Sequence, residues 1–102
     1  MSVKEEIERC VESMLAGSPM TPEQESLLVN AANEADDYRR ASGEWDDPKN
    51  IAPTWHYVVS QFHRCVTDGR KLSQKDRTMW RKQFAILGAG IDEIRLERVE
   101  LG

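Results

Sequence analysis

The sequence predicts an all-α protein, a small single-domain bundle of four main helices with a short C-terminal helix or an extended tail. Two observations lead to this prediction. Apolar residues recur at helical spacing in four segments, and each segment follows a residue that commonly caps a helix. A chain of 102 residues forms one domain, residues 1–102, and is long enough to bury a core without metal or disulfide support.

The first helix is predicted to begin after Ser2 and to end at Gly17. Ser2 and Glu5 form a capping box, in which each side chain accepts a hydrogen bond from a backbone N–H of the first turn. Gly17 supplies the residue type that most often ends a helix. The apolar face of this helix consists of Val3, Ile7, Cys10, Val11, Met14 and Leu15.

The second helix is predicted to begin at Thr21-Pro22, because Thr21 caps, Pro22 suits the first helical position and Gln24 completes a capping box. It should end between Ala41 and Gly43. Its alanines favour a close approach to a neighbouring helix. The apolar face consists of Leu27, Leu28, Ala31, Ala32, Ala35 and Tyr38.

The third and fourth helices are predicted from similar signals. Thr54 opens the third and Asp68-Gly69 ends it, with an apolar face of Trp55, Val58, Val59, Phe62, Cys65 and Val66. Ser73 caps the fourth, and Gly88-Ala89-Gly90 is predicted to stop it. Its apolar side consists of Met79, Trp80, Phe84 and Leu87. For residues 91–102 a short fifth helix is favoured over an extended tail that pairs with a partner.

The basic segment before and within the fourth helix is the most unusual feature of the composition. Residues 69–82 carry a net charge of +5, whereas the whole chain carries −4. On a helical wheel the charges cover the exposed arc, while Trp80 points toward the core. These residues form the predicted partner-binding surface: Arg70, Lys71, Lys75, Arg77, Arg81 and Lys82.

Three interpretations of this surface stay open. It can contact a protein partner, or it can bind the phosphates of a nucleic acid or nucleotide. The third helix, a turn with Gly69 and the fourth helix follow the order of a helix–turn–helix, although the acidic remainder of the chain disfavours DNA. The charges can also pair internally with the acidic faces of the first two helices, or with those of a second copy.

The loop at residues 42–53 is a second candidate contact region. Trp45 lies beside Asp46 and Asp47, and an exposed tryptophan among carboxylates can anchor a protein interface. The alternative is that Trp45 folds back and covers the bundle core. A loop of this length is typical of either a functional segment or one packed on the body.

Other polar groups do not indicate catalysis or cofactor binding. His56 and His63 lie two turns apart, too far to share one metal ion, and Asp36 and Asp37 fit a solvated helix face. Cys10 and Cys65 are expected to be buried free thiols, although a disulfide between them stays open. We therefore expect no catalytic residues, no metal site and no cofactor.

These observations predict a non-enzymatic interaction protein that binds another macromolecule and inhibits it, with self-association as a further expectation. The alternative is a nucleic-acid or nucleotide-binding protein that uses the basic surface. The size and composition suit the small accessory or inhibitor proteins that phages and mobile elements often encode. The chain has no apolar run that predicts a membrane span or a secretory signal, so a cytoplasmic protein with no membrane partner is expected.

Overall fold

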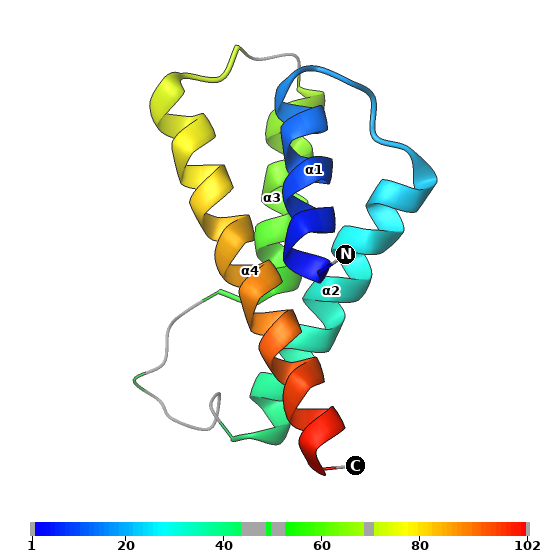
Figure 1. Ribbon diagram of the computed structural model, residues 1–102. Coiled ribbons are helices and arrows are strands. Elements are labelled where there is room, and N and C mark those ends of the chain that lie inside the picture. Colours follow the sequence, from blue (N-terminus) through cyan, green and yellow to red (C-terminus); the bar gives the residue numbers. More distant parts are fainter. Residues whose placement is uncertain (1, 44–48, 50–52, 69–70, 102) are drawn as a thin grey trace.

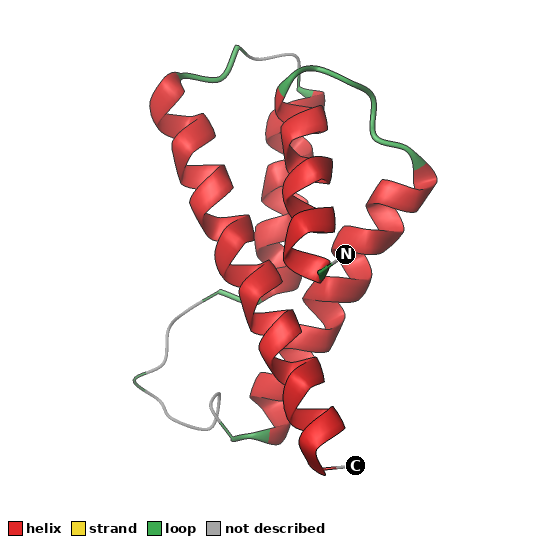
Figure 2. Cartoon of the chain, viewed as in Figure 1, coloured by secondary structure: helices red, strands yellow, loops and turns green. Residues whose placement is uncertain are grey.

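The computed structural model describes residues 2–43, 49, 53–68 and 71–101, and within these residues the chain forms four helices and no strand (Figure 2). The predicted all-α bundle is therefore confirmed. Successive helices run in opposite directions (Figure 1). Their bounds are α1 Val3–Leu15, α2 Pro22–Ala41, α3 Trp55–Thr67 and α4 Gln74–Leu101.

The helix ends follow the local capping signals in the sequence. The Thr21 side chain accepts a hydrogen bond from the Gln24 N–H, and the Gln24 side chain accepts one from the Thr21 N–H, which completes the predicted capping box. Ser2, Thr54 and Ser73 each accept a hydrogen bond from the N–H three residues later. After α1, Gly17 has a φ of 94°, the left-handed conformation that glycine adopts without a steric penalty.

The predicted stop at Gly88-Ala89-Gly90 is wrong, because α4 continues through it to Leu101. Residues 91–101 are therefore neither a separate short helix nor an extended tail. The physical reason is packing: a Cβ at Gly88 would lie 2.6 Å from the Cα of Lys4, so glycine allows α1 to approach α4 closely. The cost of about 1 kcal/mol for glycine within a helix is offset by burial of Leu87, Ile91 and Ile94.

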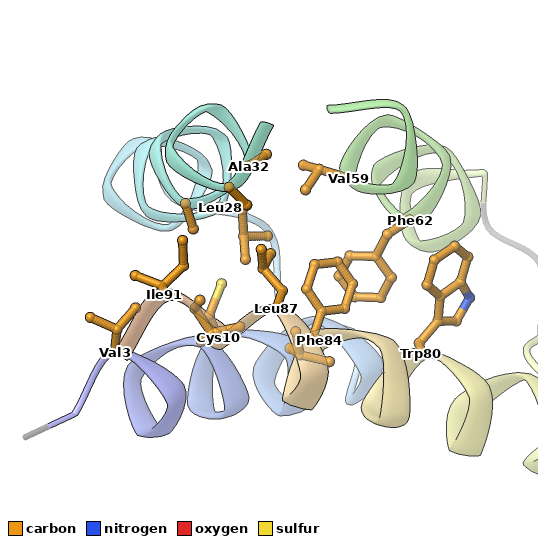
Figure 3. Packing of buried hydrophobic residues seen from close by; sticks show 14 of the residues in the cluster. Val3, Cys10, Leu28, Ala32, Val59, Phe62, Trp80, Phe84, Leu87 and Ile91 are labelled. Carbon is orange, nitrogen blue, oxygen red and sulfur yellow. The ribbon is translucent and has the colours of Figure 1, made fainter. Parts of the chain in front are cut away.

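The core lies between two layers of helices, with α1 and α4 on one side and α2 and α3 on the other (Figure 3). At one end, the Phe62 ring lies 5.2 Å from that of Trp80 and 4.8 Å from that of Phe84, centroid to centroid. Trp80 is buried, as predicted. Met79 and Tyr38 are exposed, so their assignment to apolar core faces is wrong.

Two carboxylates cap the N-terminal ends of helices that are distant from them in the sequence. Asp36 of α2 accepts hydrogen bonds from the Trp55 and His56 N–H groups, at 2.8 and 3.0 Å, and so caps the start of α3. Asp92 of α4 does the same for α1, accepting from the Val3 and Lys4 N–H groups at 3.0 and 3.1 Å. Asp36 is buried, so its predicted place on a solvated face is wrong.

Candidate functional site

The basic surface predicted from the sequence divides into two parts in the structure. Lys71, Lys75 and Lys82 are exposed to solvent. Arg77 and Arg81 instead turn toward α1 and make contacts within the chain. Arg70 lies outside the described residues, as do Trp45, Asp46 and Asp47 of the second predicted contact region.

Arg77 caps the C-terminal end of α1. The half-buried guanidinium donates a hydrogen bond from Nη1 to the carbonyl of Leu15 at 3.1 Å and one from Nε to the carbonyl of Leu72 at 3.5 Å. The last carbonyls of a helix lack partners within the helix and carry the negative end of its dipole. A cation at this position therefore joins α1, the loop before α4 and α4 itself.

Arg81 pairs with the acidic face of α1. Its Nε lies 2.5 Å from Oε1 of Glu12 and its Nη2 lies 3.2 Å from Oε2, a two-pronged geometry. The hydrogen bond to Glu12 raises the pKa of Arg81 above its ordinary value. The internal pairing left open in the sequence thus holds for Arg81 and the first helix.

The acidic face of the second helix has different basic partners. Glu34 of α2 accepts hydrogen bonds from Arg95 at 3.3 Å and from Arg98 at 3.0 Å. Both arginines lie in the last two turns of α4, outside the basic segment that the sequence singled out. They hold the C-terminal part of α4 against α2, where Tyr38 also donates a hydrogen bond to Glu97 at 3.1 Å.

The solvent-facing side of α4 carries a continuous stripe that was not predicted as a unit. Its members follow alternating spacings of four and three residues and are all exposed. We call them the outer stripe: Lys75, Met79, Lys82, Ile86, Ala89, Glu93 and Leu96. Side chains at this spacing lie on one face of a helix.

The apolar members of the outer stripe are unusually accessible. The exposed fraction is 40% for Met79, 53% for Ile86 and 59% for Leu96. The signal for this surface was available on the helical wheel, where Met79 and Ile86 lie close to Lys75 and Lys82 and far from Trp80. Met79 was predicted to lie in the core because it is apolar, although its position on the helical wheel is on the side of Lys75 and Lys82.

A groove runs beside the outer stripe, between α4 and the facing ends of α2 and α3. It encloses about 340 Å³. Gly90 lies along it, and a Cβ at Gly90 would meet no heavy atom within 4 Å. Apolar Ile86 and the acidic residues Glu93 and Glu97 all line the groove from α4. The full lining consists of Ala35, Tyr38, Arg39, Trp55, Ile86, Leu87, Gly90, Glu93, Ile94 and Glu97.

Groups with chemical reactivity are scattered rather than assembled. Within the described ranges, no three His, Cys, Asp or Glu side chains come together to form a metal site, and His56 and His63 are both exposed. The two cysteines are free thiols, Cys10 buried as predicted and Cys65 half-buried. Burial raises the pKa of Cys10 to about 11, which keeps it a neutral thiol at physiological pH.

Comparisons of the chain with protein-family models, with curated proteins and with solved structures find no match. In the part of the chain that the structure describes, every helix is too short or too polar to span a bilayer.

Proposed function

We propose that this protein is a non-enzymatic binding module that contacts another macromolecule through the outer stripe of α4. One observation carries the proposal: Met79, Ile86 and Leu96 are 40–59% exposed on one face of the longest helix. Apolar side chains that recur on one exposed face of a helix are the usual anchors of helix-in-groove contacts with a protein partner. Because these side chains are 40–59% exposed, a partner that covers them would gain about 0.6–1.8 kcal/mol each, the same fraction of what full burial gains.

The charges of the stripe support a protein partner. Lys75 and Lys82 lie in its N-terminal half and Glu93 in its C-terminal half, with Ile86 between them. Opposite charges around an apolar centre resemble the polar rim and apolar core of protein interfaces. Such charges chiefly determine orientation and choice of partner, because exposed pairs contribute only about 0–1 kcal/mol each.

A pull-down from lysate of the cells that make this protein tests the proposal. Wild type is compared with Ile86→Lys and with Asn33→Lys, which adds the same charge at an exposed position on α2. We expect specific capture of a protein by wild type and by Asn33→Lys, and loss of that capture with Ile86→Lys. Equal capture by all three forms would contradict the assignment to the outer stripe.

Nucleic-acid binding is the second candidate, because Lys71, Lys75 and Lys82 are exposed around the first turns of α4. The internal contacts of Arg77 and Arg81 leave fewer charges for phosphate than the sequence implied. If this candidate is correct, affinity for a mixed DNA and RNA pool should fall steeply with salt and disappear with Lys75→Glu. Failure to bind the pool at low salt would remove it.

Inhibition of the bound macromolecule, a phage or mobile-element origin and a cytoplasmic location all stay predictions from the sequence. The surface fits an inhibitor because a rigid helix can cover a partner's functional groove. An activity assay on whichever protein the pull-down identifies would test this directly. Activity that is unchanged by a molar excess of this protein would argue for an accessory role instead.

A further inference from the structure

The exposed face of α4 carries its charges in a self-complementary order. Lys75 and Lys82 come first, Ile86 and Ala89 lie at the centre, and Glu93 and Glu97 follow, all of them exposed. Lys75 and Glu97 are each eleven residues from Ile86, and Met79 and Glu93 are each seven residues from it. A second helix of the same sequence, laid antiparallel about Ile86, would therefore place Lys75 opposite Glu97 and Lys82 opposite Gly90, three residues from Glu93.

We propose that the occupant of the outer stripe is a second copy of this chain, paired through antiparallel α4 helices with the two-fold axis beside Ile86. This inference rests on the proposed function, because it names the partner of the same surface. Ile86 would face Ile86 of the second copy, and Lys75 would face Glu97 of the second copy. In the parallel arrangement lysine would face lysine, so the charges select the antiparallel one.

The spacing and the side-chain sizes fit this arrangement. Alternating steps of four and three residues form the seam of a two-stranded coiled coil, in which helix axes lie about 8–10 Å apart. Gly90 and Ala89 are small and allow a close approach. Lys82 of the second copy would lie opposite Gly90, where space is open, and Met79 of the second copy would lie opposite Glu93.

In a two-fold symmetric dimer both copies use the same surface, so every contact between them occurs twice. In a Lys75→Glu dimer, glutamate would face Glu97 at both ends; in a Glu97→Lys dimer, lysine would face Lys75 at both ends. In a one-to-one mixture of the two variants, each end would instead join a glutamate to a lysine. Each single variant should therefore be monomeric, and the mixture of the two variants should form a heterodimer.

Sedimentation equilibrium measures the outcome. Wild type should have twice the 11.7 kDa mass of one chain, each single variant should have the mass of one chain, and the mixture should regain the doubled mass. The control is Arg9→Glu, which makes the same change of charge on the exposed side of α1 and should leave the dimer intact. Single variants that dimerise like wild type, or a mixture that stays monomeric, would overturn the proposal.

A cysteine test covers the case in which Glu97→Lys harms the fold by removing the hydrogen bond from Tyr38. In a Cys65→Ser background, Ile86→Cys lies at the proposed two-fold axis and should form a disulfide between copies under a mild oxidant. Lys75→Cys, far from its own symmetry mate, should not. Equal cross-linking at both positions would contradict the antiparallel register.

Failure of this inference can be told apart from failure of the proposed function. A monomeric wild type that captures a different protein, with capture lost in Ile86→Lys, would refute self-pairing and leave the outer stripe as a binding surface. A monomeric wild type that captures nothing would refute both.

Discussion

An alanine at Gly88 should destabilise the fold, whereas an alanine at Gly90 should stabilise it. Both glycines lie within α4 and differ only in what faces them. A Cβ at Gly88 would lie 2.6 Å from the Cα of Lys4 and 3.1 Å from its Cβ, so the start of α1 would have to move. A Cβ at Gly90 would meet nothing within 4 Å.

The expected magnitudes follow from two opposing terms. Replacing glycine by alanine within a helix gains about 1 kcal/mol of free energy of unfolding at either position. Forcing a methyl group against backbone costs about 1–3 kcal/mol, and here it also pulls the start of α1 away from the Asp92 carboxylate that caps it. Gly88→Ala should therefore lose up to about 2 kcal/mol, and Gly90→Ala should gain up to about 1 kcal/mol.

Urea unfolding followed by far-ultraviolet circular dichroism measures both values. Both substitutions are made in the Lys75→Glu form, so that the proposed pairing of chains does not contribute. The opposite signs are the diagnostic result. If Gly88→Ala stabilises the protein as much as Gly90→Ala does, then α1 does not contact α4 at Gly88 and the packing described above is wrong.

Three further outcomes are expected. Asp36→Ala should lower the free energy of unfolding by about 2 kcal/mol, because two N–H groups of α3 lose their acceptor. Asp36→Asn should lower it less, and equal losses for the two variants would contradict the capping role. Arg77→Met should lower the urea midpoint, whereas Arg81→Met, at an exposed ion pair, should leave it nearly unchanged. At about pH 8 a thiol reagent should label Cys65 before Cys10, because the Cys10 pKa of about 11 leaves about one Cys10 thiol in a thousand ionised. The rate of Cys10 labelling should rise about tenfold per pH unit. A Cys10 labelling rate that does not change with pH would contradict the raised pKa.

Features encoded by neighbouring residues could be predicted from the sequence. The capping box of Thr21 and Gln24 involves residues three apart, and the left-handed Gly17 acts on its own helix. The apolar face of α1 is likewise a local pattern, and all six of its predicted members are buried. The bundle class and the helix starts were therefore accessible without knowledge of the packing.

Features that depend on a distant partner could not be predicted. A glycine such as Gly88 can end a helix or can let another helix pack closely against it, and the neighbouring residues are the same in both cases. The position of α1, whose Lys4 lies against Gly88, decides which of the two occurs. Asp36 caps a helix that begins 19 residues later, and Asp92 caps one that begins 89 residues earlier. A carboxylate on a polar helix face gives no local sign of such a role.

The candidate surface shows the same division. The excess of lysine and arginine in residues 69–82 was visible in the sequence. Which of these residues face solvent was not visible, because Arg77 and Arg81 form hydrogen bonds with α1. Met79 and Ile86 could have been placed in solvent from the wheel alone. Their exposure changes the emphasis from a purely basic surface to an amphipathic stripe.

The central claim is that the outer stripe of α4 is the contact surface of the protein, and site-specific photo-cross-linking tests it most directly. A photoreactive amino acid replaces Ile86 in one form and Asn33, exposed on α2, in the other. After irradiation in the cells that make the protein, the form carrying the label at Ile86 should give a discrete covalent adduct, and the form carrying it at Asn33 should not. Absence of an adduct from Ile86, or equal adducts from both positions, would contradict the claim.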